Sequence, residues 1–220
     1  MKIPSLMQRI QEIANIHAEQ LGFGYDALDK AGIYWVLYNI RIEFSGLPRC
    51  NEKISLKIWP SGCSRLVAAR EFICTGKNSR PFFKAVSQWM ILGRNSGKPK
   101  DLIRSVHGLP KNGERALEEK IKRLELVNDY IHTGCMYVPY SSIDLNGYVN
   151  FREYIRWGVD ALKKGCRLHD NISSLQATYL SEVFENDELD LLVSGNNDKQ
   201  GFQIRRMGTN DTLFLMEIAQ

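Results

Sequence analysis

The sequence predicts an α+β fold in which one unit, a long helix followed by four strands, occurs twice. Two stretches place apolar residues at helical spacing, and each is followed by four runs that are typical of β-strands. The stretches 54–72 and 189–207 also share one layout, a strand, a glycine turn and a strand ending in arginine, at an offset of roughly 135 residues. We therefore expect a duplicated helix-plus-sheet architecture.

Length and composition are those of an ordinary globular protein. The 220 residues, 44% of them hydrophobic, suffice to bury the core of one large domain or two small ones. The net charge of +4 is mildly basic, which is compatible with an acidic partner and gives no case for nucleic acid.

Cysteine usage and the amino terminus indicate where the protein works. The five cysteines are odd in number and form neither a C-x-x-C pair nor a zinc-like cluster, so we expect a reducing compartment. Arg9, Glu12 and Glu19 interrupt the stretch that a signal peptide would keep apolar, and no later apolar run is long enough to span a membrane. Phosphate-loop and metal-binding motifs are also missing. We expect a cytoplasmic protein without membrane insertion, cofactor or metal.

The first unit begins with an amphipathic helix that we expect to end near Gly22. Ser5 and Gln8 have the spacing of a capping box at its start. We interpret His17, which falls on the apolar stripe, as a core or interface histidine with its hydrogen bonds satisfied. The stripe consists of Leu6, Ile10, Ile13 and His17, and the strand-like runs follow at 35–44, 53–59, 66–74 and 82–92.

The second unit repeats this order and adds a strand-like lead-in, "GCMYVPYS", before its helix. We expect that helix over Val149 to Lys164, with Asn150 and Glu153 as a cap-like pair and Gly165 ending it. The first unit has no lead-in, so we expect it to lack a first strand, either because the sequence is truncated or because its sheet is shorter. Strand-like runs follow the second helix at 172–183, 188–194, 202–207 and 212–218.

A connecting segment separates the two units. We expect the first unit over residues 1–95, a linker over 96–130 and the second unit over 131–220. In the linker, "ALEEKIKRLEL" has oppositely charged i,i+4 pairs and predicts a short packed helix. Its basic residues favour an acidic protein partner, although a solvated basic surface also accounts for them. These residues are Lys98, Lys100, Arg104, Lys111, Arg115, Lys120, Lys122 and Arg123.

Polar side chains gather at the entrance of the second helix. Asp144, Asn146, Tyr148 and Asn150 stand at alternate positions there. A helix N-terminus has free backbone N–H groups and a positive dipole end, which attract an oxyanion or a polarised carbonyl. Turn and cap chemistry is the alternative explanation of the same residues. A second carboxylate, Glu182, would act as a general base on water if its strand passed beside this entrance, or would simply face solvent.

The stretch "SSIDLNGYVNFREYIRW" resembles the D-x-N-x-H-V-N-x-x-x-Y-I-x-W signature of acyl-acyl carrier protein thioesterases. In the first half, "IQEIANIHAEQLGFGYDALDKAGIYWVL", "LKIWPSG", "REF" and "AVSQWMIL" resemble that family's markers, in order and at similar spacing. The resemblance implies two tandem hotdog units, each an antiparallel sheet wrapped around a long helix. It also implies hydrolysis of the thioester between a fatty acyl chain and the acidic acyl carrier protein, and an acyl chain lying along the helix of the first unit.

Residue by residue, the resemblance implies that Asp144 and Asn146 match the active-site Asp and Asn, and Glu182 the acidic residue after the helix. Two positions depart from the family pattern: Tyr148 stands in place of its histidine, and Val183 in place of a frequent cysteine. Val183 removes any cysteine nucleophile, so water becomes the expected attacking group. A phenol is mostly protonated at neutral pH and does not replace imidazole as a proton shuttle.

The resulting hypothesis is that Glu182, held by Asp144 and Asn146, activates water while Tyr148 positions the substrate. Backbone N–H groups near Val149 and Asn150 would stabilise the oxyanion. Two alternatives stay open: a non-catalytic module that binds acyl chains or the carrier protein, and a hotdog thioesterase acting on coenzyme A esters. An unfinished first sheet would also leave an edge through which a homodimer could form.

Overall fold

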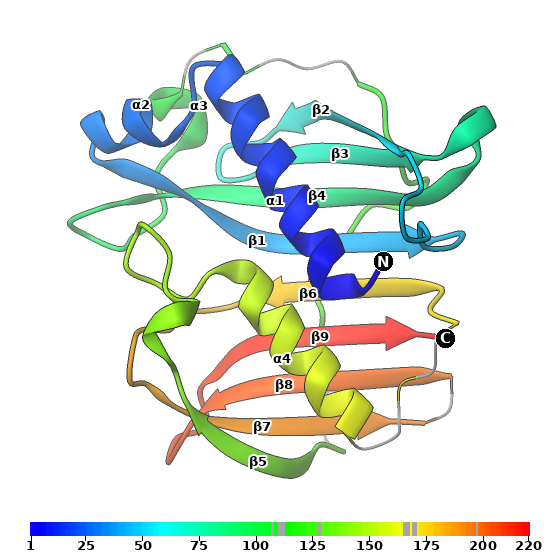
Figure 1. Cartoon of the computed structure of the whole chain (residues 1–220). Coiled ribbons are helices and arrows are strands. Elements are labelled where there is room, and N and C mark those ends of the chain that lie inside the picture. The colour runs from blue at the N-terminus through cyan, green and yellow to red at the C-terminus, as the bar shows by residue number, and fades with distance from the viewer. Residues whose placement is uncertain (107, 110–112, 127–128, 165–167, 169–170, 197) are drawn as a thin grey trace. The chain divides into compact units, whose positions relative to one another are not determined.

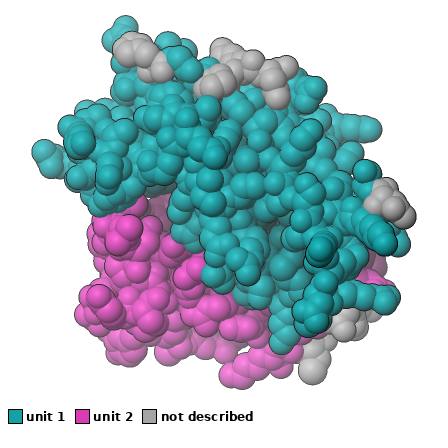
Figure 2. Space-filling view, turned by 45° about the horizontal axis from the view of Figure 1, so that its top comes forward, with its two compact units in different colours: residues 1–121 teal, residues 122–220 magenta. Residues whose placement is uncertain are grey.

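The computed structural model describes residues 1–220 apart from 107, 110–112, 127–128, 165–167, 169–170 and 197. The chain forms two compact units, Met1–Ile121 and Lys122–Gln220, which Figure 2 shows in separate colours. Their boundary falls inside the predicted linker. The α+β prediction is confirmed, because the strand pairs within each unit are antiparallel and each unit has one long helix.

Unit 1 is a sheet with strand order β2-β3-β4-β1, and the long helix α1 crosses one face of it (Figure 1). The four predicted strands are confirmed with small shifts at their ends. Its elements are α1 (Ile3–Gln20), α2 (Tyr25–Lys30), β1 (Ile33–Phe44), β2 (Ser55–Cys63), β3 (Ala68–Thr75), η1 (Lys77–Ser79), β4 (Pro81–Gly93) and α3 (Leu102–Ser105).

Unit 2 is a sheet with strand order β6-β9-β8-β7-β5, crossed by the long helix α4 (Figure 1). The lead-in strand before the helix is confirmed as β5. Its elements are β5 (Ile131–Tyr137), η2 (Tyr140–Ser142), α4 (Phe151–Lys164), β6 (Ser174–Tyr179), β7 (Glu188–Gly195), β8 (Lys199–Arg206) and β9 (Thr212–Ala219). Gly165, the expected end of α4, lies outside the described residues.

The two units share one topology. The order β2-β3-β4-β1 in unit 1 corresponds to β7-β8-β9-β6 in unit 2, each following its own long helix. Unit 2 has one further strand, β5, paired with β7. Among the described residues of unit 1 no strand takes the place of β5, so β2 forms the edge of that unit's sheet. The predicted duplication and the shorter first sheet are both confirmed.

The expected capping box of α1 is wrong. The helix begins at Ile3, and its N-cap residue Lys2 makes no side-chain cap hydrogen bond. Pro4 lies in the first turn, where its missing N–H costs nothing and its fixed φ favours the helix. Ser5 is therefore already helical. The six-residue helix α2 lies between α1 and β1, where no helix was predicted from the sequence.

The helix expected over 116–126 is also wrong, because this stretch consists of bends and irregular backbone. The i,i+4 charge pairs that suggested it contribute only about 0.2–0.5 kcal/mol each. Backbone groups instead bond to side chains elsewhere: Ala116 N–H donates to Glu71 Oε2 at 3.1 Å, and Leu124 N–H to Thr178 Oγ1 at 3.1 Å. The only short helix described within the predicted linker, residues 96–130, is α3, which lies earlier in the chain.

A buried cation lies between α1 and the sheet of unit 1. Arg70 on β3 donates from Nη1 to the carbonyl of Ala14 at 3.0 Å, and its guanidinium carbon lies 5.9 and 5.8 Å from the ring centroids of Trp35 and Trp89. Burial lowers the pKa of Arg70 to about 10, so it stays charged at neutral pH. Burial and this charge lower the pKa of His17, whose buried Nδ1 has no hydrogen-bond partner. The expected satisfied histidine is therefore wrong.

Helix α4 approaches its sheet closely at Gly158. A Cβ at this position would lie 2.5 Å from Met216 Cε and 2.7 Å from Phe202 Cδ1, both shorter than real contacts allow. Phe202 and Met216 are buried on β8 and β9. The glycine therefore sets the depth at which α4, and the site at its amino end, sits on the sheet.

We predict that Gly158→Ala destabilises the protein by up to about 2 kcal/mol, measured as the free energy of unfolding in urea. Alanine gains about 1 kcal/mol of helix propensity over glycine, but overpacking a filled core costs typically about 1–3 kcal/mol. Lys164→Ala, at an exposed position of the same helix, is the control and should change stability little. A stabilised Gly158→Ala protein would show that the sheet gives way at no cost.

Candidate active site

The loop before α4 is a tight turn. Ile143 and Val149 form an isolated antiparallel bridge, and between them Asp144 N–H donates to the Tyr148 carbonyl at 2.8 Å. Gly147 N–H donates to the Asp144 carbonyl at 3.0 Å, with Gly147 at φ +86°, a region that favours glycine. The Asn-Gly pair thus provides the turn, as its chemistry suggests.

The Asp144 carboxylate points back into this turn. Its Oδ1 accepts the Asn146 backbone N–H at 2.7 Å, and the carboxylate also accepts the Tyr148 backbone N–H and the Asn146 side chain. Burial raises the pKa of Asp144 even though these hydrogen bonds favour the charged form. Asp144 therefore holds the Asn146 carboxamide in place.

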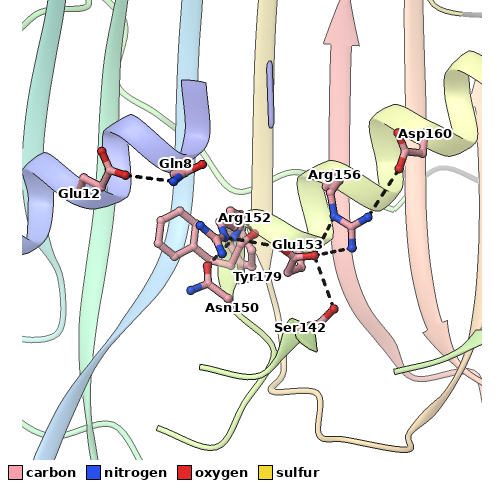
Figure 3. Close-up of polar contacts among 10 residues, drawn as sticks. Gln8, Glu12, Ser142, Asn150, Arg152, Glu153, Arg156, Asp160 and Tyr179 are labelled. Carbon is pink, nitrogen blue, oxygen red and sulfur yellow. Dashed lines mark hydrogen bonds and ion pairs between the residues drawn. The ribbon is translucent and has the colours of Figure 1, made fainter. Parts of the chain in front are cut away.

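Asn150 caps α4, as predicted. Its Oδ1 accepts the Arg152 backbone N–H at 3.2 Å, and the helix begins at Phe151, two residues later than expected. Glu153 is not the reciprocal cap partner that was predicted. Figure 3 shows its carboxylate turned toward Arg156 and Ser142: Oε2 accepts from Arg156 Nε at 2.8 Å and Nη2 at 2.5 Å, and from Ser142 Oγ at 3.5 Å.

The two backbone N–H groups expected to stabilise an oxyanion both donate to backbone carbonyls. Val149 N–H donates to the Val183 carbonyl at 2.9 Å, and Asn150 N–H donates to the Ser142 carbonyl at 2.8 Å. Both N–H groups therefore already have carbonyl acceptors in this structure. The physical reason is that a buried backbone donor must find a partner, and the folded loop supplies carbonyls at this entrance.

Glu182 follows the strand rather than lying in it. β6 ends at Tyr179 and not near 183 as expected, although Leu180 and Ser181 still donate to the Leu213 carbonyl at 2.9 and 3.3 Å. The next residues leave the sheet and reach the entrance of α4, where the Val183 carbonyl accepts from Val149. The stretch therefore passes beside the helix entrance, which is the condition on which a general-base role for Glu182 depended. Glu182 is partly buried there.

The pKa of Tyr154, one turn into α4, indicates that Asp144 and Glu182 both lie near its hydroxyl. Burial is the largest factor raising the pKa of this phenol, and the negative charge of Glu182 is the next. Asp144 and Asp187 raise it further, against a hydrogen bond with the Val183 backbone. Both predicted carboxylates therefore act on the same hydroxyl. The sequence signal that could have identified Tyr154 is the tyrosine of "FREYIRW".

Tyr179, which the sequence did not single out either, fastens the helix entrance to the end of β6. Its hydroxyl donates to the Phe151 carbonyl at 2.9 Å. Its ring centroid lies 5.4 Å from that of Tyr154 and 4.9 Å from that of Phe214, so three aromatic rings pack behind the entrance.

Tyr148 packs against the loop after Glu182. Its ring meets Phe184 edge to face, with centroids 5.3 Å apart. That loop is braced by Phe184 N–H donating to Asp187 Oδ2 at 3.0 Å and by an Arg206–Asp187 ion pair at 2.8 Å. Tyr148 is therefore held by packing, which suits a positioning role better than proton transfer.

Two further features bear on what the site could hold. Within the described residues no group of three or more His, Cys, Asp and Glu side chains could bind a metal ion. A cavity of about 240 Å³ lies elsewhere in unit 2, between residues 124–125 and 129–130 and the strands β7, β8 and β9, and includes none of the candidate residues.

Family patterns match both units. The acyl-ACP thioesterase N-terminal domain matches residues 1–107, and the acyl-ACP thioesterase C-terminal domain matches residues 129–218. The chain belongs to the acyl-ACP thioesterase family. Within this family, it is similar to a chloroplastic palmitoyl-acyl carrier protein thioesterase of Arabidopsis thaliana, with 21% identity over 207 residues, 87% of this chain and 50% of that protein.

Solved structures of two thioesterases have the same fold as this chain. An acyl-ACP thioesterase from Bacteroides thetaiotaomicron superposes with a TM-score of 0.85 at 23% identity, and the 12:0-ACP thioesterase from Umbellularia californica with 0.83 at 16%. Each match covers 100% of this chain and 89% of the other. At such identities the likeness shows the fold, which confirms the hotdog prediction.

The chain covers only part of its curated relatives, between 50% and 57% of the length of three chloroplastic thioesterases. None of the described helices combines the length and the apolar character needed to cross a bilayer.

We predict that Asp144 makes stability depend on pH in a defined direction. Because its folded pKa is raised above the unfolded value, its contribution is fully present below the unfolded pKa, about 4, and is lost as pH rises through the folded pKa. Asp144→Asn removes this dependence. Urea unfolding at a series of pH values should therefore show wild type losing stability relative to Asp144→Asn as pH rises.

Asp211→Asn, which removes an exposed carboxylate, is the control for a change in net charge. If wild type gained stability over Asp144→Asn with rising pH, the hydrogen bonds to the carboxylate would outweigh its burial, and the proposed direction would be wrong.

Proposed function

We propose that this chain hydrolyses fatty acyl-acyl carrier protein thioesters to free fatty acid and carrier protein, with water activated by Glu182. The observation that carries the proposal is the convergence of Asp144 and Glu182 on the entrance of α4, within a chain of the acyl-ACP thioesterase family. Burial raises the pKa of Asp144, and the partly buried Glu182 beside the same entrance is a carboxylate that can serve as a general base on water.

In the proposed mechanism each residue has one task. Asp144 holds the Asn146 carboxamide, and Asn146 orients the water or the thioester. Glu182 takes the proton from water as it attacks the thioester carbon. The leaving thiolate is stable enough to depart with little acid assistance, because thiols have pKa values of about 8.5. Tyr148, packed on Phe184, positions the substrate. The scheme does not use the N–H groups of Val149 and Asn150.

We predict that Glu182→Gln lowers kcat for acyl-carrier hydrolysis by about 100-fold or more, because an amide does not take up the proton. Thiol release from an acyl-carrier substrate measures this. Glu185→Gln, an exposed carboxylate in the same loop, is the matched control and should keep wild-type turnover. Undiminished turnover by Glu182→Gln would exclude Glu182 as the base.

We predict that Tyr148→His raises turnover about tenfold or more in the same assay. Imidazole, with a pKa near 6.5, exchanges protons at neutral pH, whereas a phenol with a pKa near 10 does not. Tyr148→Phe separates the two parts of the side chain, because it keeps the packing on Phe184 and loses only the hydroxyl. A Tyr148→His protein less active than wild type would mean that the phenol itself is required.

One observation favours a second candidate function. Tyr148 in place of the family histidine suits a non-catalytic module that binds acyl chains or the carrier protein. Purified protein that binds acyl chains but releases no thiol would support that function. Comparing carrier and coenzyme A esters of equal acyl length would distinguish a third candidate, a thioesterase acting on coenzyme A esters.

Two further proposals concern the location of the protein and its oligomeric state. A reducing, cytoplasmic location is supported by cysteine usage, with Cys50, Cys63, Cys74 and Cys135 all free thiols. A homodimer is supported by β2, which among the described residues has a strand partner on one side only. The register irregularity between Pro60 and Gly62 would confine further pairing to the start of the strand. The oligomeric state in solution tests the latter.

A further inference from the structure

Charge is divided unequally between the two units. Residues 1–121 contain 19 Lys and Arg against 11 Asp and Glu, a net charge of +8. Residues 122–220 contain 10 Lys and Arg against 14 Asp and Glu, a net charge of −4. The modest overall value of +4 therefore hides a strongly basic first unit. An acidic partner would be attracted to unit 1 and repelled by unit 2.

Part of this basic excess lies on one rigid platform. The β2–β3 turn and α3 are joined by Leu102 N–H donating to the Arg65 carbonyl at 2.7 Å. Leu102 itself is fully buried in a core cluster with Leu28, Ile33 and Ile91. This anchor holds α3 against the turn, so the residues flanking Leu102 and Arg65 project outward in fixed positions.

Asp101 organises the charges of the platform. Its carboxylate accepts from Arg65 Nε at 2.9 Å and lies 3.8 Å from Arg104 Nε. Although desolvation acts in the opposite direction, hydrogen bonds from the Arg104 backbone and from Arg65, with both positive charges, lower the pKa of Asp101. One carboxylate thus orients two guanidinium groups and leaves a net positive charge.

Apolar side chains lie beside these cations. Ile103 is 57% exposed and Leu66 43% exposed, whereas the side chains of Arg65 and Arg104 are 76% and 84% exposed. A single exposed apolar residue needs no explanation. Here there are two, one on the β2–β3 turn and one on α3, and each is adjacent to an arginine, a composition found in protein interfaces. We call these residues, with the nearby exposed lysines, the α3 patch: Arg65, Leu66, Lys98, Lys100, Ile103 and Arg104.

We propose that the α3 patch is the docking surface for the acidic acyl carrier protein, an inference that rests on the proposed function. The guanidinium groups would pair with carboxylates of the carrier, while Leu66 and Ile103 fill an apolar contact between them. Docking on unit 1 would leave the acidic unit 2 to the chemistry. The two tasks then belong to different copies of the duplicated unit.

The test compares substrates with and without the protein carrier. For Arg65→Gln/Arg104→Gln we expect KM for an acyl-carrier substrate to rise about tenfold, as the loss of rim charges slows association. Hydrolysis of the same acyl group on free pantetheine should keep its wild-type kcat/KM. Arg65→Lys/Arg104→Lys should recover part of the loss, and Ile103→Ala should raise KM for the carrier substrate alone.

The chain offers a matched control at the other end of β3. Lys77→Gln/Arg80→Gln removes the same two positive charges from exposed positions around η1, so it tests whether net charge alone matters. We expect this pair to leave KM within about twofold of wild type. An equal rise in both double variants, or no rise in Arg65→Gln/Arg104→Gln, overturns the proposal. Thermal unfolding verifies that each variant is folded.

A binding measurement separates this proposal from the proposed function. Titration of the carrier protein without an acyl group into wild type should give binding that weakens with salt and is weakened about tenfold by Arg65→Gln/Arg104→Gln. That result supports the docking surface even if no thioester is hydrolysed. Wild-type binding to an oligonucleotide but not to the carrier would instead identify a general polyanion site and overturn the proposal.

Discussion

One hydrogen bond, from Val149 N–H to the Val183 carbonyl at 2.9 Å, holds the candidate site together. It joins the turn before α4 to the segment after β6, and its two partners are the immediate neighbours of Tyr148 and Glu182. The aromatic packing of Tyr179 behind it and the close approach of Gly158 fix the depth of the helix. Together with the ring contact between Tyr148 and Phe184, this bond keeps the residues proposed to act together beside one helix entrance.

The same bond shows that polar groups at the helix entrance mainly stabilise the fold, although their residue types suggest ligand binding. Most hydrogen bonds at this entrance stabilise the turn and the helix cap. They involve Asp144, Asn150 and the first N–H groups of the helix. Folding therefore consumes the donors that a bare helix terminus would offer to a ligand. The chemical steps are therefore assigned to other groups that the turn orients, among them Glu182 and the Asn146 carboxamide.

Much of this fold was predictable, since periodicity identifies strands such as Ser55–Cys63 and helices such as α4 without any knowledge of tertiary contacts. The duplication also followed from spacing alone. The expected linker helix failed because partners far along the chain decided the outcome. Glu71 and Thr178 took the backbone donors of the expected linker helix, and Ser142 and Val183 took those of the expected oxyanion site. Nothing local in "ALEEKIKRLEL" reports such partners.

The tryptophans around the buried Arg70 between α1 and the sheet of unit 1 make the fluorescence of the two units separable. Trp35 and Trp89 both face the Arg70 guanidinium, and with Trp59 they place three of the four indoles in unit 1. The fourth, Trp157, is buried on α4 in unit 2. Tryptophan emission from a protein in which Trp157 is replaced by phenylalanine comes from unit 1 alone. The two halves of the duplication thus carry separate intrinsic reporters, without any attached dye.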